Sequence, residues 1–189
     1  AGAAVLGAAL QAMPRIRFTK LLLGHNDLTV AGAASVAPAL RRPWGDRRLK
    51  RLWVNSNPLG DAGVAALAKA LPPTLDWLDV EGTGCGDDGL VALAAALPAL
   101  THLVTLRCGY NPDAGARGWV ALAGALPSLP ALETLFLQEN AGMGSEGAAA
   151  LALAIPNCSR LTFLDVRSSG LDEQAKSTLG ALERLVEYH

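Results

Sequence analysis

The chain has few aromatic residues, few cysteines and almost no net charge. Aromatic residues make up 5% of the 189 residues although 51% are hydrophobic, so the apolar mass is mainly alanine, leucine and valine. Such side chains suit a core built from small, regular units. Sixteen Lys and Arg against seventeen Asp and Glu give a formal net charge of −1. We therefore expect no overall field for nucleic acid or an anionic membrane.

Closely spaced thiols and long apolar runs are also missing. Three cysteines with no CxxC pair argue against zinc and redox motifs and favour a reducing, intracellular and cytoplasmic setting. Cys85, in a glycine-rich loop, is expected to be the most reachable thiol. No stretch approaches the roughly 20 apolar residues of a membrane-spanning helix. His25, His102 and His189 lack metal-ligand spacing, so neither a metal nor a cofactor is predicted.

What the chain does contain is an internal repeat. The pattern Leu-x-x-Leu-x-Leu-x-x-Asn occurs six times with a few substitutions, and its last positions lie 26 to 31 residues apart. Those last positions are Asn26, Asn57, Thr83, Asn111, Asn140 and Ser169. This regular spacing predicts that one structural unit is repeated along the chain.

A second motif lies between these copies. It has Gly, then Leu or Val four residues later, Gly or Ala at five, Ala at seven and Leu or Ile at eight. It begins at Gly2, Gly32, Gly63, Gly89, Gly118 and Gly147. Because the apolar positions lie one turn apart on one helical face, each unit is predicted to be a strand followed by a helix. The segment from Gly2 to Leu10 is then the helix of a repeat whose strand is missing.

Proline and short polar residues mark the ends of the predicted helices. A proline directly follows the last Leu or Ile in four units, where it stops a helix. These are Pro72, Pro98, Pro127 and Pro156. Asp61, Asp87 and Ser145 each stand two residues before a helix glycine, and we expect them to be N-caps of their own helices.

One unit of this kind cannot bury its apolar face alone, so the units must stack. We expect an α/β fold: a solenoid forming a horseshoe segment, with parallel strands on the concave face and helices on the convex face. Residues 1–189 are predicted to form one domain of about six units. Residues 171–189 are expected to be a closing helix, with Ala175, Leu179, Leu182 and Val186 on one stripe.

The alternation of L-x-x-L-x-L-x-x-N with G-x-x-A-L-A-x-A-L resembles the ribonuclease-inhibitor type of leucine-rich repeat, from Gly2 to about Leu185. Repeats of this type occur in ribonuclease inhibitors, NOD-like receptors and Ran GTPase-activating proteins. The resemblance implies a structural asparagine ladder that hydrogen-bonds to the backbone where each strand turns away. Its members would be Asn26, Asn57, Asn111 and Asn140. Thr83 and Ser169 interrupt it, so the third and sixth turns are expected to be less well fixed.

Side chains alternate along a strand, so with the leucines inward the intervening residues face the concave side. The predicted partner-binding residues are Arg51, Trp53, Trp77, Asp79, Glu81, Arg107, Phe136, Phe163, Asp165 and Arg167. Trp53 and Trp77 fall on adjacent strands and with Leu22 would form a contiguous patch, which monomers usually avoid. The alternative is that these are isolated exposed residues, which are common.

Two further motifs could indicate binding of a nucleotide or of nucleic acid. Gly84-Gly86-Gly89 and Gly142-Gly144-Gly147 match GxGxxG, but their third glycine is the helix glycine of every unit, so no nucleotide site is predicted. The segment from Arg41 to Arg51 holds six basic residues and one acid, Asp46. It could contact phosphate or nucleic acid. We favour a solvated loop, because the net charge is nearly zero.

The predicted function is therefore binding and not catalysis. The chain is interpreted as a protein–protein interaction module with a scaffold or sensor role. Its partner would be another protein or other domains of a longer chain. Because the first strand and an initiator Met are missing, we expect the sequence to be a fragment of that longer chain. The alternative implied by the resemblance is a GTPase-activating protein of the Ran-regulator type, for which no catalytic residue is assigned.

Overall fold

The computed structural model describes residues 2–12, 19–41, 49–180 and 186–187. Strands and helices alternate along the chain. The strands are β1 (Lys20–Leu22), β2 (Arg51–Trp53), β3 (Trp77–Asp79), β4 (Thr105–Arg107), β5 (Thr134–Phe136), β6 (Phe163–Asp165) and β7 (Val186–Glu187). The helices are α1 (Gly2–Ala12), α2 (Val30–Leu40), α3 (Gly60–Ala68), α4 (Asp87–Ala96), α5 (Ala116–Ala125), α6 (Gly144–Ala154) and α7 (Glu173–Gly180).

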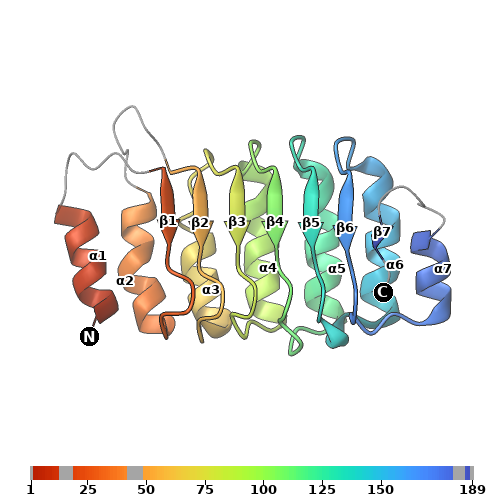
Figure 1. Ribbon diagram of the computed structural model, residues 1–189, viewed down its shortest axis with the longest axis horizontal. Coiled ribbons are helices and arrows are strands. Elements are labelled where there is room, and N and C mark those ends of the chain that lie inside the picture. The colour runs from red at the N-terminus through yellow and green to blue at the C-terminus, as the bar shows by residue number, and fades with distance from the viewer. Residues whose placement is uncertain (1, 13–18, 42–48, 181–185, 188–189) are drawn as a thin grey trace.

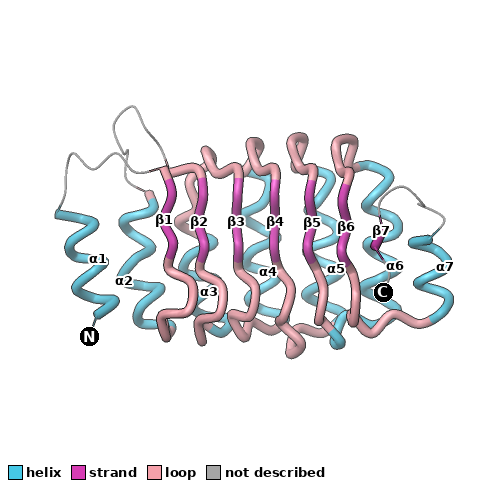
Figure 2. The backbone as a smooth tube through the Cα atoms, viewed as in Figure 1, coloured by secondary structure: helices cyan, strands magenta, loops and turns pink. Residues whose placement is uncertain are grey.

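The seven strands form one parallel sheet in chain order, from β1 to β7. Figures 1 and 2 show the strands side by side in one layer and the described helices in a second layer on one side of it. Each helix packs against the next, from α1 on α2 to α6 on α7. The predicted α/β solenoid, with strands on one face and helices on the other, is confirmed.

The central leucine of each short strand points into the core. These leucines are aligned across the sheet: Leu21, Leu52, Leu78, Leu106, Leu135 and Leu164. All six are at most 9% exposed. Because side chains alternate along a strand, the residues on either side of each leucine face away from the helices. We call the surface that they form the strand face.

The helix glycines bring neighbouring helices close together. A Cβ at Gly147 of α6 would lie 2.9 Å from Trp119 Cβ of α5 and 2.7 Å from Met143 Cγ. Trp119 is fully buried and donates its indole N–H to the carbonyl of Ala114. The glycine therefore leaves space for the largest side chain of the core.

The predicted helix stops are also found. Pro98, Pro127 and Pro156 lie in single 3-10 turns that follow α4, α5 and α6: η1 (Leu97–Ala99), η2 (Leu126–Ser128) and η4 (Ile155–Asn157). A further 3-10 turn, η3 (Ala141–Met143), precedes α6. Proline fits the start of such a turn, where its missing N–H is not needed.

Asp61 and Asp87 were predicted to cap their own helices, and this prediction was wrong. Both residues lie in the first turn of their own helices, and neither helix has a side-chain cap of its own. Asp61 Oδ1 instead accepts hydrogen bonds from the backbone N–H groups of Gly86 (2.7 Å) and Gly89 (2.8 Å) in the next unit. Asp87 Oδ1 accepts from Gly118 N (2.9 Å) in the same way. Parallel stacking places each helix start beside the next one, so the carboxylate reaches across.

The expected closing helix is shorter than predicted. Helix α7 ends at Gly180, with Ala175 and Leu179 buried against the core. Val186 belongs to strand β7, where it pairs with Leu164 of β6, so the helical stripe does not continue to it. Leu182 lies outside the described residues. A strand at this place supplies hydrogen-bonding partners to the edge of β6, which a helix could not do.

Candidate protein-binding surface

The asparagine ladder connects the turns that follow the strands. Asn57 Oδ1 accepts from the N–H groups of Asn26 and Leu28, and its Nδ2 donates to the carbonyl of Leu23 in the preceding unit. Asn111 and Asn140 make the same kind of contact to the units before them. The Asn26 side chain is exposed, and its Nδ2 donates to the carbonyl of Gly24 in its own unit. The described chain has no strand before β1 for it to contact.

Thr83 and Ser169 keep part of this role. Thr83 Oγ1 donates to the carbonyl of Val80 in its own unit, whereas Ser169 Oγ donates to the carbonyl of Leu137 in the preceding unit. Both side chains are buried. A hydroxyl offers one donor where the amide offers two. Each turn is therefore held by fewer hydrogen bonds than its neighbours.

The strand face consists of three rows that cross the sheet. The middle row is Leu22, Trp53, Asp79, Arg107, Phe136 and Asp165, and the first row is Lys20, Arg51, Trp77, Thr105, Thr134 and Phe163. The third row follows the strands: Gly24, Asn55, Glu81, Gly109, Gln138 and Arg167. The ten residues predicted to contact a partner lie within these rows.

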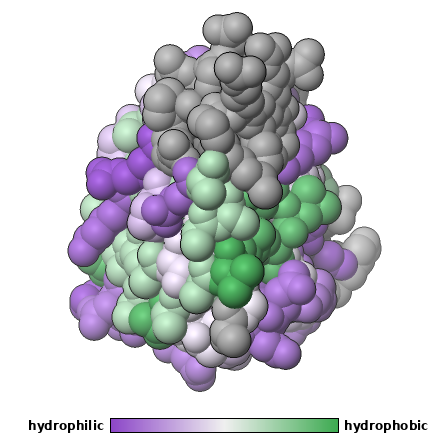
Figure 3. Space-filling view, turned by 90° about the vertical axis from the view of Figure 1, so that its left-hand side faces the viewer, coloured by the Kyte–Doolittle hydropathy of each residue, from purple (hydrophilic) through white to green (hydrophobic). Residues whose placement is uncertain are grey.

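An aromatic pair lies on β2 and β3. The ring centroids of Trp53 and Trp77 are 5.7 Å apart at an angle of 33°. Arg51 lies over the Trp77 ring at 6.0 Å and forms an ion pair with Asp76. Both tryptophans are half-buried, and the adjoining Leu22 is 65% exposed. Figure 3 shows the α1 end of the stack, where apolar surface lies between hydrophilic residues.

A second aromatic pair lies on β5 and β6. The centroids of Phe136 and Phe163 are 5.0 Å apart. The guanidinium carbon of Arg107 lies 4.7 Å from the Phe136 centroid. Stacking of a cation on an aromatic face is favourable and limits the side chain's motion. Arg107 therefore joins the second aromatic pair to the polar residues between the two pairs.

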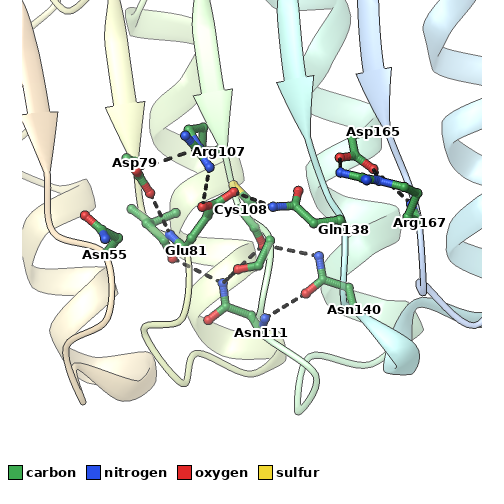
Figure 4. Close-up of polar contacts among 12 residues, drawn as sticks. Asn55, Asp79, Glu81, Arg107, Cys108, Asn111, Gln138, Asn140, Asp165 and Arg167 are labelled. Atoms are coloured by element: carbon green, nitrogen blue, oxygen red, sulfur yellow. Dashed lines mark hydrogen bonds and ion pairs between the residues drawn. The ribbon is translucent and has the colours of Figure 1, made fainter. Parts of the chain in front are cut away.

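Between the aromatic pairs lies a cluster that we call the polar centre, formed by Asp79, Glu81, Arg107 and Gln138. Arg107 Nη2 donates to Glu81 Oε2 at 2.7 Å, and Gln138 Nε2 donates to Glu81 Oε1 at 2.9 Å. Arg107 Nε is 3.8 Å from Asp79 Oδ2, a charge contact without a hydrogen bond. Figure 4 shows the side chains of Asp79, Glu81 and Gln138 around Arg107.

Three acidic side chains of the strand face are more deeply buried than the sequence indicated. Asp79 is 3% exposed, Glu81 8% and Asp165 0%, although all three were expected to face solvent. They do lie on the strand face, but neighbouring side chains on closely spaced strands cover them. Asp165 is compensated by an ion pair with Arg167 in its own unit. A partner would meet the aromatic and arginine side chains first.

Burial changes the protonation of one of these acids. Desolvation raises the pKa of Asp79 from 3.8 to about 6, and the charge of Glu81 adds to the rise. The backbone N–H of Glu81, which donates to Asp79, lowers the pKa, and the electrostatic interactions with Arg107 and His25 do the same. Asp79 Oδ2 has only a 3.8 Å charge contact with Arg107, so the buried carboxylate is incompletely compensated.

Gln138 and its glycine were not recognised as site residues from the sequence. The Gln138 side chain crosses Gly109, where a Cβ would lie 2.8 Å from Gln138 Cδ. Gly24 similarly leaves room for Asn55, whose Oδ1 would lie 2.4 Å from a Cβ at that position. The sequence signal for this arrangement is a third-row glycine followed, in the next unit, by a third-row Asn or Gln.

The remaining sequence predictions can be placed as well. Cys85 is fully buried, not reachable as expected, and burial raises the pKa of its thiol to about 11. Cys108 and Cys158 are buried. His25 is exposed. Most of the basic segment from Arg41 to Arg51, at positions 42–48, lies outside the described residues.

In the glycine-rich sequence Gly84-Gly86-Gly89, the backbone N–H groups of Gly86 and Gly89 already have a hydrogen-bond acceptor. The N–H groups of Gly86 and Gly89 that a phosphate would need are bonded to Asp61. Among the described residues, no group of three or more His, Cys, Asp or Glu side chains is placed to hold a metal ion. No described helix is long and apolar enough to cross a membrane.

Comparison with known proteins agrees with this architecture. The family model "Leucine Rich repeat" matches residues 47–68. A search of curated proteins gave no match. The solved structures that resemble the chain include one from the yeast Rad7–Elc1 complex, with 20% identity, a TM-score of 0.57, and coverage of 85% of this chain and 38% of the other.

Two more solved structures are similar. An internalin from Listeria monocytogenes has 20% identity and a TM-score of 0.55, covering 91% of this chain and 48% of its own. Leiomodin-1 actin-binding site 2 has 14% identity and a TM-score of 0.55, covering 96% and 85%. The chain spans less than half the length of the first two. At these identities the likeness shows the fold alone, a solenoid of strand–helix repeats, of which residues 47–68 match the leucine-rich repeat model.

Proposed function

We propose that the chain binds a protein partner through the strand face. The observation that carries this proposal is the row of half-buried aromatic side chains, Trp53 and Trp77 at one side and Phe136 and Phe163 at the other. Aromatic and arginine side chains around a centre that excludes water are typical of binding hot spots. Among the described elements no helix covers this face (Figure 1).

Its size is consistent with this role. Six strands about 4.8 Å apart span roughly 24 Å. Three outward residues on each strand approach the low end of the 20 to 30 residues that a standard interface contributes on each side. Loops beside the strands would complete the contact. We further propose that it serves as a scaffold or sensor module, intracellular and without enzymatic activity.

Similar folds support a protein partner as the class of ligand. One of the similar chains was solved in a complex of Rad7 with Elc1, and another is named an actin-binding site. We also propose the ribonuclease-inhibitor subtype of the repeat, because α1 to α6 are complete helices of 9 to 11 residues. Shorter repeat types connect their strands with less helix.

The GTPase-activating alternative gains no support from the strand face. An arginine that stabilises phosphoryl transfer must extend into the partner's active site. Arg51, Arg107 and Arg167 instead form ion pairs with Asp76, Glu81 and Asp165. We therefore propose protein binding, and not GTPase activation, as the function of the strand face.

Affinity capture with three forms of the chain tests this function. The Trp53→Ala/Trp77→Ala variant removes the first aromatic pair, and we expect it to lose the partners that the wild type recovers. A Val120→Ala/Leu153→Ala variant removes exposed apolar side chains from the helix side, and it should keep them. Thermal unfolding checks that all three are folded. Equal recovery by the tryptophan variant, or loss only in the helix-side variant, would contradict the proposal.

A further inference from the structure

The polar centre carries an excess negative charge. Asp79 Oδ1 accepts from Glu81 N, and both carboxylate oxygens of Glu81 accept from Gln138 and Arg107. Asp79 Oδ2 has only the 3.8 Å charge contact with Arg107. The two carboxylates and one guanidinium leave one net negative charge. A buried carboxylate with incomplete compensation is unfavourable until a donor or a cation reaches it.

A second and independent observation is an unpaired amide oxygen. Gln138 is 6% exposed, and its Oε1 is buried without a hydrogen-bond partner. Its Nε2 is held by Glu81, which fixes the orientation of the amide and leaves the oxygen as an acceptor. Buried acceptors of this kind are rare in folded proteins, because leaving one unpaired is unfavourable. Arg107 Nε of the same cluster is a buried donor without a hydrogen-bond partner, so the polar centre holds one unpaired acceptor and one unpaired donor.

The surroundings of the polar centre suit a basic side chain. Trp53 is the neighbour of Asp79 in the middle row, and Phe136 is the neighbour of Arg107 on the other side. Lysine and arginine side chains place their hydrocarbon stems along aromatic rings while their charged ends reach polar groups. Arg51 on Trp77 and Arg107 on Phe136 are two cases of this packing within the same surface.

We propose that the polar centre receives a lysine or arginine side chain of the protein partner, whose N–H groups are donated to Asp79 Oδ2 or Gln138 Oε1 while its stem lies against the adjacent aromatic ring. The inference rests on the proposed function and names the chemistry of the partner: an exposed segment with a basic residue flanked by apolar residues. The aromatic pairs on either side bind the apolar neighbours of that residue.

Selection of a random-peptide library on the immobilised chain provides a probe. Peptides that bind the wild type and lose binding to Trp53→Ala/Trp77→Ala are strand-face ligands, and we expect them to be enriched in a basic residue beside apolar ones. In a synthetic peptide, replacing that basic residue by norleucine should weaken binding about 10-fold or more, as expected for a hydrogen bond to a charged group.

The variant Asp79→Asn removes one charge and keeps the shape of the side chain. It should weaken the basic peptide about 10-fold or more and leave the norleucine peptide unaffected. Asp88→Asn is the control, because Asp88 is an exposed carboxylate on helix α4, away from the strand face, and is paired with Arg117. It should change binding less than about 2-fold. Thermal unfolding of both variants checks their folding.

Acidity provides a separate test. The charged and titratable groups facing Asp79 are Glu81, Arg107 and His25. As the pH falls from about 7.5 to about 5.5, Asp79 takes up a proton and the wild type should lose affinity for the basic peptide. Asp79→Asn should lose markedly less. An unchanged difference between the two proteins across this range would count against the inference.

The outcomes separate the two proposals. Strand-face peptides without a basic residue, or basic peptides that bind Asp79→Asn as well as wild type, overturn the inference and leave the proposed function intact. Failure to enrich any strand-face peptide also overturns it, and the affinity capture then decides the function by itself. If the tryptophan variant and the helix-side control both keep the partners of the wild type, the proposed function is overturned.

Discussion

Gln138 donates a hydrogen bond to Glu81 across an intervening strand. The two residues are 57 positions apart in sequence, and the amide reaches the carboxylate over the backbone of Gly109. The contact therefore joins the third and fifth units and depends on a missing side chain in the fourth.

Gly109→Ala should destabilise the chain for this reason. An added Cβ would lie 2.8 Å from Gln138 Cδ and 2.9 Å from the Gln138 carbonyl oxygen, so the neighbouring backbone must move. We expect a loss of about 1 to 3 kcal/mol in the free energy of unfolding, measured by urea denaturation. Gly124→Ala on α5 is the control: it has open space around it and should gain about 0.5 to 1 kcal/mol. Equal effects of the two substitutions would refute this explanation.

Asp61→Ala should weaken the junction between α3 and α4. Its Oδ1 accepts two backbone N–H groups at the start of α4, so the substitution leaves both without a partner. A lost helix cap costs about 1 to 2 kcal/mol. Asp88→Ala, which removes an exposed carboxylate that pairs with Arg117, should cost less than about 0.5 kcal/mol. Hydrogen exchange at Gly86 and Gly89 should be faster in Asp61→Ala only.

The raised pKa of Asp79 predicts the pH dependence of stability. The folded chain holds this proton up to pH about 6, whereas the unfolded chain releases it near 3.8. The folded state therefore binds more protons between these values, and the contribution of Asp79 to stability falls as the pH rises through this window. Asp79→Asn should become more stable relative to wild type by about 2 to 3 kcal/mol between pH 4 and pH 7.

Urea denaturation of both proteins at several pH values measures this difference. A stability difference that stays constant from pH 4 to 7 would show that Asp79 ionises normally in the folded chain. Asp88→Asn again serves as the comparison, since it removes an exposed carboxylate on helix α4.

The three thiols should be unreactive in the folded chain. Cys85, Cys108 and Cys158 are all buried, and burial raises the pKa of each thiol. Because the thiolate is the reactive form, a thiol-specific reagent at neutral pH should label none of them rapidly and all three in denaturant. Rapid labelling of one thiol without denaturant would show that its unit opens locally.

Much of the fold and of the strand face follows from the sequence. The leucines recur every second residue within a strand and once per unit along the chain, so strand, helix and outward residue can each be assigned. Trp53 lies beside Asp79 and Phe136 beside Asp165, as this assignment of equivalent strand positions requires. The repeat also explained the glycine-rich motifs without a nucleotide.

Contacts between units could not be predicted in the same way. The sequence placed Asp61 at a helix start but did not show that its carboxylate reaches the next helix, and it placed Cys85 in a glycine-rich loop without showing that the loop is packed. The burial of Asp79 depends on how the larger side chains around it are turned. These are properties of two or three units in contact.

The sequence by itself determined which residues belong to strands and helices and which of them face outward, because periodicity is local and repeats in every unit. Only the tertiary structure decided the depth of burial on the strand face, the partners of Asp61, Asp79 and Gln138, and the presence of strand β7 where a helix was expected. The physical reason is that hydrogen bonding and desolvation depend on atoms from neighbouring units, whose distances no spacing within one unit specifies.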